Sequence, residues 1–278
     1  MTNPDRPAGR GLQERPSPVK VRAVEAGIPV LQPQRAREPE LNERMHELSP
    51  DVACVVAYGK LLPAELLGIP RLGFVNAHFS LLPAYRGAAP VQWALINGDA
   101  VTGISIMRLS EGMDEGPLLA TEQAAIHPSD NAITLGWRLA HRAAPLLVET
   151  VIAYAEGRIQ PLPQPGEGIS YAPKLRVDDL RIDWSRSAAE INNLIRGGNP
   201  EPGAWTTFRE RRVKLLRARP AQGSGLPPGH IDLVRDGLMV GCGRGSLLVT
   251  TAQLQSKRAL PAAELGRGLR LGQGDRFE

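Results

Sequence analysis

The sequence predicts two domains: an α/β domain built on a parallel sheet, followed by a small antiparallel β-barrel. Three observations carry this prediction. The chain has 278 residues, more than one small domain needs. Between residues 51 and 156, apolar strand-like runs alternate with helix-like segments, which is typical of a parallel sheet with crossover helices. Beyond residue 200, short β-rich runs are separated by glycine and proline, as in a barrel.

The elements of the α/β domain follow from local patterns. Residues 51–57 form an uninterrupted apolar run of the kind found in a strand buried on both faces. The next strand is expected over 73–78, and an alternating strand over 102–109. Helices are expected over 63–67, 89–97 and 134–156, and the longest of these has apolar residues at helical spacing and stops at a glycine.

The second domain begins after a proline-rich stretch without periodicity, residues 160–178, which predicts an interdomain linker. We therefore divide the chain into 1–159, the linker 160–178, and 179–278. Ser187 and Glu190 form a capping-type start for a helix over 188–196, and Gly197 and Gly198 are expected to loosen its end. Five strands are expected over 204–208, 213–217, 230–234, 237–241 and 246–250, which fits a barrel of the oligonucleotide-binding kind, and a last helix over 261–267.

Composition excludes several classes of protein. Hydrophobic residues make up 42% and charged residues 22%, as in globular proteins. No apolar stretch approaches the roughly 20 residues that cross a bilayer, and the first residues lack the apolar core of a secretory signal. We therefore expect a cytoplasmic protein without a membrane partner. Cys54 and Cys242 are expected to be packed thiols, and the histidines are isolated, so we expect no disulfide and no metal.

Charge is distributed unevenly along the chain. Residues 1–178 contain 17 basic and 19 acidic residues, whereas residues 179–278 contain 16 basic and 10 acidic residues. Such asymmetry indicates either a surface for a polyanion or a solvated arginine-rich face, and charge alone does not decide between them. An aromatic content of 4% argues against extensive base stacking.

The densest chemical feature lies at the end of the strand expected over 73–78. Asn76 and His78 are two residues apart, so their side chains project to the same side of the strand. An amide and an imidazole together can hydrogen-bond a developing oxyanion, and histidine also transfers protons near neutral pH. Asp114 follows the strand expected over 102–109, and adjacent parallel strands would bring it to His78. The alternatives are a structural histidine and an aspartate that stabilises its own turn.

These residues also carry a family resemblance. The run 76–90, NAHFSLLPAYRGAAP, together with Gly112-Met-Asp114-Glu-Gly116, resembles the signature of formyltransferases that use 10-formyltetrahydrofolate. Segments 4–11 with 16–20, then 171–174, 181–184, 199–200 and 202–204, resemble the members of that family that act on initiator methionyl-tRNA. The match extends over nearly the whole chain, and it implies a Rossmann-like first domain.

The resemblance implies a role for each matching residue. Asn76, His78 and Asp114 match the catalytic trio, and Ser80, Leu81, Leu82 and Pro83 match the folate-contacting loop. Arg10 and Lys20 lie in the segment that matches a tRNA-binding loop, and Lys174 lies at the approach to the second domain. The implied reaction moves the formyl group of 10-formyltetrahydrofolate to the α-amino group of methionine on initiator methionyl-tRNA. The implied enzyme is a monomer without a metal.

The sequence also departs from the family pattern at its front. That pattern opens with a strand, a helix and a strand over roughly 30 residues, which are missing here, so we expect an exposed interior sheet edge and poor folding. Two other functions stay open: a formyltransferase that acts on a small amine, and a catalytically impaired RNA-binding protein. The basic second domain and the Arg10 segment argue against the first, and the intact trio argues against the second.

Overall fold

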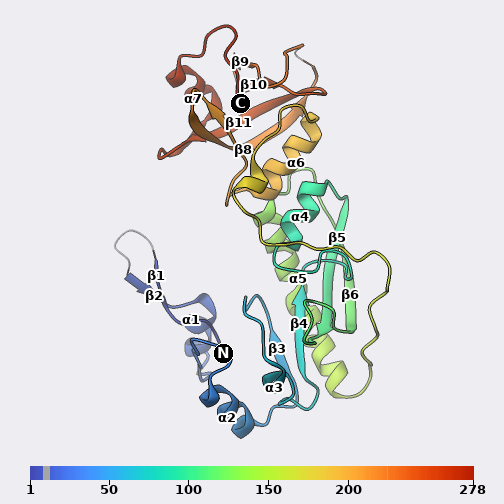
Figure 1. Cartoon of the computed structure of the whole chain (residues 1–278). Coiled ribbons are helices and arrows are strands. Elements are labelled where there is room, and N and C mark those ends of the chain that lie inside the picture. The colour runs from blue at the N-terminus through green and yellow to red at the C-terminus, as the bar shows by residue number, and fades with distance from the viewer. Residues whose placement is uncertain (9–12, 224) are drawn as a thin grey trace. The chain divides into compact units, whose positions relative to one another are not determined.

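The computed structural model describes residues 1–8, 13–223 and 225–278 (Figure 1). The chain forms two compact units, and each is described by itself. The first contains Met1–His78, Ser105–Ala120 and Pro145–Pro165; the second contains Phe79–Ile104, Thr121–Ala144 and Gly166–Glu278.

The helices, as the structure has them, are α1 (Pro18–Glu25), α2 (Pro39–Leu48), α3 (Ala64–Leu67), α4 (Pro90–Asn97), α5 (Ala132–Ala155), α6 (Ala188–Gly198) and α7 (Ala262–Leu269), with a 3₁₀ turn at Asp178–Leu180. The strands are β1 (Arg6–Ala8), β2 (Gln13–Arg15), β3 (Ala53–Val55), β4 (Phe74–His78), β5 (Val101–Arg108), β6 (Leu118–Ala125), β7 (Trp205–Phe208), β8 (Arg211–Ala221), β9 (Ile231–Val234), β10 (Gly237–Gly241), β11 (Ser246–Leu254) and β12 (Ala259–Pro261).

The sheet that carries the candidate residues has the order β3-β4-β5-β6. β3 and β4 are parallel, and Val55 lies opposite Asn76. The predicted α/β class is therefore confirmed, but the direction expected for β5 is wrong. β5 runs antiparallel to β4 and places Ser105 opposite His78 and Arg108 opposite Val75. Hydropathy along a strand records its burial and not its direction, so the pattern of residues 102–109 could not distinguish the two pairings.

The beginning of the chain has regular structure within the segment that resembles a tRNA-binding loop. β1 and β2 pair antiparallel within the segment that the sequence suggests is a loop, and α1 and α2 follow. α1 starts at Pro18 behind the N-cap Ser17, whose hydroxyl accepts a hydrogen bond from the Lys20 backbone N–H. The first unit packs its core around Leu41, Leu66 and Phe74, which brings α2, α3 and β4 together.

The C-terminal part of the second unit is an antiparallel sheet. Its strands follow the order β7-β8-β11-β10-β9, and β12 pairs with β11. The antiparallel second domain is confirmed, although its sheet has six strands where the sequence predicts five. β12 escaped prediction because it has only three residues and runs directly into α7. The core of this sheet includes Trp184 and Phe277, whose rings stack with centroids 5.6 Å apart.

The glycines at the end of α6 serve close packing. A Cβ on Gly197 would lie 2.5 Å from Ile96 Cγ1 and 2.7 Å from the Gln92 carbonyl oxygen, so only glycine lets α6 approach α4 this closely. Gly198 similarly faces the side chain of Leu180. The sequence predicts that these glycines loosen the helix end after residue 196, but α6 continues through both of them to Gly198. Their low helix propensity is accepted at a position where a side chain would not fit.

The proline-rich segment 160–178 is hydrogen-bonded to other parts of the protein at several points. Leu162 exchanges two backbone hydrogen bonds with Leu118 at the start of β6, with lengths of 2.7 and 2.8 Å. Within the second unit, the indole N–H of Trp93 donates to the Pro173 carbonyl at 2.8 Å. The indole N–H of Trp205 donates to the Val177 carbonyl at 2.7 Å. The segment therefore docks through backbone groups, and also through Leu175, which packs with Leu180 and Trp205. Its sequence composition reveals neither contact.

Both cysteines are free. Cys242 is buried as expected, whereas Cys54 is exposed, because β3 is only three residues long and its middle residue faces outward. Over the described part of the chain, no helix combines the length and the apolar character that a bilayer crossing requires.

Candidate active site

The strand β4 presents the first two candidate residues. Asn76 and His78 project to the same side of β4 because side chains alternate along a strand. His78 is the last residue of this strand and is buried, and Asn76 is half-buried. β4 (Phe74–His78) lies within the strand predicted over 73–78, and the placement of Asn76 and His78 on one side follows from it.

Asp114 lies in the same compact unit, in the turn that follows β5. Its Oδ2 is 3.7 Å from Nδ1 of His78, and the two side chains are 18% and 6% exposed. This separation is longer than a hydrogen bond, as contacts between catalytic groups often are in the absence of substrate. The sequence correctly predicts that Asp114 lies close to His78. It predicts that a parallel strand brings Asp114 there, whereas β5, the strand before Asp114, is antiparallel to β4.

The loop that follows β4 contains the predicted folate contacts and belongs to the second unit. Ser80, Leu82 and Pro83 are buried, and Leu81 is half-buried. The Ser80 hydroxyl donates to the Ala84 carbonyl at 2.6 Å, which fixes the loop internally. Three of the four residues are buried as whole residues, so Leu81 is the one most accessible to a ligand.

The next residues of the signature are held by the docked segment. The Arg86 N–H donates to the Ser170 carbonyl at 2.9 Å, and the Ala172 N–H donates to the Arg86 carbonyl at 2.7 Å. Gly87 has a φ of 120°, and a Cβ there would lie 2.8 Å from the Ala172 carbonyl oxygen. The glycine of this motif is therefore required by the close approach of segment 170–172.

Tyr85, at a φ of 60°, is fixed by its side chain. Its hydroxyl donates to Asp99 Oδ2 at 2.6 Å and accepts a hydrogen bond from Asn97 Nδ2 at 2.9 Å. Burial, together with the bond to the Asp99 carboxylate, raises the pKa of Tyr85 to about 12. The hydroxyl is therefore a permanent donor at neutral pH, and this favours a structural role in holding the loop.

The three predicted tRNA contacts have different surroundings. Arg10 lies outside the described residues. Lys20, in the first unit, is ion-paired with Asp5 at 2.6 Å and is less than one-third exposed. This hydrogen bond, together with one from Gln32, holds the pKa of the Asp5 carboxyl below its usual range. Lys174, in the second unit, is exposed.

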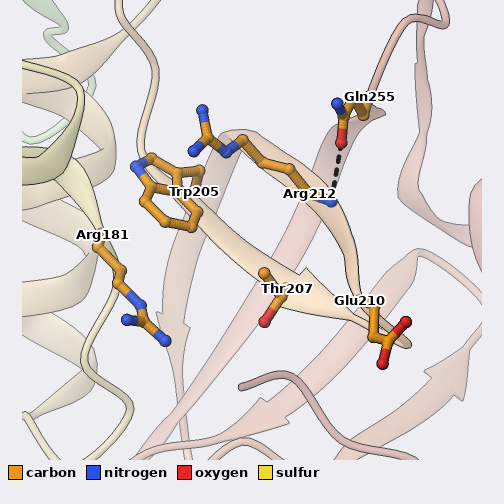
Figure 2. A pocket seen from close by; sticks show the side chains of 6 residues that line it. All are labelled: Arg181, Trp205, Thr207, Glu210, Arg212 and Gln255. Carbon is orange, nitrogen blue, oxygen red and sulfur yellow. Dashed lines mark hydrogen bonds between the residues drawn. The ribbon is translucent and has the colours of Figure 1, made fainter.

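The second unit also contains a basic pocket of about 470 Å³ that the sequence did not single out (Figure 2). It is lined by Arg181, Trp205, Thr207, Glu210, Arg212 and Gln255. The guanidinium carbons of Arg212 and Arg181 lie 4.0 and 5.7 Å from the centre of the Trp205 ring. Within the described ranges, no carboxylate forms an ion pair with either guanidinium. Two arginines held on an aromatic face without an ion-pair partner suit an anionic ligand, although Glu210 contributes one opposing charge to the lining.

One further polar residue near the trio escaped sequence reasoning. Gln164 lies in the proline-rich segment, and its side-chain amide donates to the carbonyls of Asp114 and Gly116 at 2.7 and 2.8 Å. A single glutamine among prolines gives no sequence signal. Among the residues that the structure places, no group of three or more His, Cys, Asp or Glu side chains is arranged to hold a metal ion.

The α/β fold and the Asn, His and Asp side chains at the end of β4 are those expected of a formyltransferase, and comparison with known families agrees with this class. The family model for "Formyl transferase" matches residues 1–151, and the model for "Formyl transferase, C-terminal domain" matches residues 174–270. The chain belongs to the formyltransferase family.

Individual relatives within this family are also similar to the chain. The methionyl-tRNA formyltransferase of Streptomyces coelicolor is 45% identical over 277 residues, which cover 99% of this chain and 89% of the relative. The methionyl-tRNA formyltransferase of Thermobifida fusca is 46% identical over 278 residues, which cover all of this chain and 90% of the relative.

Solved structures support the fold. HypX from Aquifex aeolicus in complex with tetrahydrofolic acid matches with a TM-score of 0.66 at 18% identity, over 87% of this chain and 44% of that chain. The sugar 3N-formyltransferase WlaRD matches with a TM-score of 0.64 at 17% identity, over 88% of this chain and 83% of that chain. These likenesses concern the architecture alone.

Proposed function

We propose that this enzyme transfers the formyl group of 10-formyltetrahydrofolate to the α-amino group of methionine on initiator methionyl-tRNA. The observation that carries the proposal is 45% identity to a methionyl-tRNA formyltransferase over 99% of the chain, through both domains. A small amine acceptor would not require similarity through the basic second domain. Translation initiation in the cytoplasm is the corresponding physiological setting.

The chemistry assigns one task to each residue of the trio. The methionine nitrogen attacks the formyl carbon, and the carbonyl oxygen becomes an oxyanion. The Asn76 amide and the His78 imidazole stabilise that charge by donating hydrogen bonds. Asp114 orients the imidazole, since its carboxylate faces Nδ1, and assists removal of the proton that the amine nitrogen loses. The bond from the formyl carbon to N10 then breaks, N10 takes a proton, and tetrahydrofolate leaves.

Binding of the two substrates is divided along the chain. We assign the folate donor to the loop Ser80–Pro83, where Leu81 is the most accessible residue. We assign the tRNA to Arg10, Lys20 and Lys174, and to the basic pocket of Arg181 and Arg212. Contacts of this type bind phosphates and position the acceptor end without reading bases. Domains 1–159 and 179–278, joined by 160–178, and a monomeric enzyme complete the proposal.

The test is transfer of labelled formyl from 10-formyltetrahydrofolate to initiator methionyl-tRNA. We expect wild-type activity, and we expect His78→Ala to lower kcat by at least about a hundredfold while tRNA binding stays unchanged. His46→Ala, which removes an exposed histidine on α2, is the matched control. Formylation of small amines but not of the tRNA would overturn the proposed acceptor. An equal loss of catalysis and tRNA binding in His78→Ala would contradict the assigned role.

A further inference from the structure

The turn that carries Asp114 is conformationally demanding. Asp114 has a φ of 53°, in the left-handed region that few residues other than glycine adopt. Gly116, two residues later, has no room for a side chain, because a Cβ would lie 1.7 Å from the Arg108 carbonyl oxygen. A backbone in such a conformation keeps one geometry only when its surroundings hold it there.

The side chain of Gln164 restrains this turn by hydrogen bonds. Its side-chain amide has two N–H donors, and the side chain reaches two carbonyls of the turn, those of Asp114 and Gly116, at 2.7 and 2.8 Å. The glutamine is half-buried and lies in the same compact unit as the trio. One planar group therefore bridges the carbonyl of the residue that faces His78 and a carbonyl two residues further on.

We propose that Gln164 is a positioning residue for catalysis, which holds the Asp114 turn so that the carboxylate faces Nδ1 of His78. The inference rests on the proposed function of Asp114. It assigns Gln164 no contact with substrate; its effect on the reaction passes through Asp114 alone.

The competing explanation is that Gln164 merely docks the proline-rich segment onto the protein. That segment is already docked beside Gln164 by the two backbone hydrogen bonds between Leu162 and Leu118. Removal of the glutamine amide leaves this docking in place. A docking role and a positioning role therefore predict different kinetic results.

The experiment is a double-mutant cycle in the formyl-transfer assay. Gln164→Ala removes the amide, and Gln164→Met removes both donors while retaining the bulk of the side chain. We expect each to lower kcat between about tenfold and about a hundredfold, with little change in the KM for either substrate, because a displaced catalytic group affects the chemical step. Gln160→Ala, an exposed glutamine on the same segment, should retain wild-type kcat.

The second arm repeats Gln164→Ala in an Asp114→Asn background, under single-turnover conditions. If Gln164 acts through Asp114, the added substitution lowers the residual rate by less than about twofold. An equal loss in both backgrounds would overturn the proposal, as would wild-type kcat in both Gln164 variants. A wild-type enzyme that does not formylate the tRNA would instead refute the proposed function, so the two failures are distinguishable.

Discussion

Replacing Arg212 with alanine tests whether the basic pocket binds the tRNA backbone. The guanidinium carbon of Arg212 lies 4.0 Å from the Trp205 ring centre, at the edge of a pocket of about 470 Å³. Arg181 contributes a second charge to that pocket. Glu210 also lines the pocket, but no ion pair joins a described carboxylate to either guanidinium, so both can bind a phosphate. We expect Arg212→Ala to weaken tRNA binding and to leave kcat at saturating tRNA unchanged.

The magnitude follows from counterion release. Each phosphate that a protein neutralises contributes about 0.7 to 0.9 to the slope of log affinity against log salt concentration. Arg212→Ala should therefore lower that slope by about 0.7 to 0.9, and the double variant with Arg181→Ala should lower it by about twice as much. The loss should be independent of tRNA sequence, because a phosphate contact reads no base.

The assay is fluorescence anisotropy of labelled initiator tRNA over a series of KCl concentrations. Arg158→Ala is the matched control, since it removes an exposed arginine of the first unit that is ion-paired with Glu156. Arg212→Lys should retain most of the salt slope, since it keeps the charge but loses the planar contact with Trp205. If Arg212→Ala and Arg158→Ala have the same slope as the wild type, the pocket does not bind phosphate and the reasoning fails.

Three further predictions concern stability, each measured by equilibrium denaturation. Ser187→Ala removes the capping box of α6 and should cost about 1 kcal/mol, with m unchanged. Trp184→Phe removes the buried hydrogen bond of 3.0 Å from the indole N–H to the Thr206 hydroxyl and should cost about 1 to 2 kcal/mol. The hydroxyl keeps its own donation to the Glu278 carbonyl at 2.8 Å, so a neutral result would show that the bond from the indole adds no net stability. Burial alone would raise the pKa of Asp130, but hydrogen bonds from Arg138 and the His127 backbone lower it more, so this carboxylate stabilises the fold above its unfolded pKa of about 3.9. Wild type should lose that contribution as pH falls through the lowered folded value, and Asp130→Asn should show a flatter pH profile.

The parts of the site that the sequence predicts are those fixed by one short segment. Asn76 and His78 lie on the same side of a strand because they are two residues apart, and no other part of the chain decides this. Local patterns of apolar and capping residues likewise predict the end of that strand and the start of α6 at Ser187.

The elements that the sequence did not predict either bury few side chains or owe their arrangement to neighbouring strands. α1 has no buried residue, and α2 buries only Leu41, so neither has a strong apolar stripe. β6 has a largely half-exposed pattern without clean alternation. The direction of β5 depends on the path by which the chain between β4 and β5 returns to the sheet, and no pattern within residues 101–108 records that path.

The segment 160–178 shows why composition misleads at the site itself. Prolines and glycines indicate a linker because they disfavour helices and central strands, yet they leave carbonyls and neighbouring N–H groups free to pair. In this chain those groups pair with Leu118 in the first unit and with Arg86 in the second. Gln164 then adds a side-chain amide at the Asp114 turn. Ala172 and Leu175 of this segment are buried as well, but two apolar residues among prolines form no periodic pattern. The proposed positioning residue Gln164 therefore lies in the part of the sequence that looks least structured.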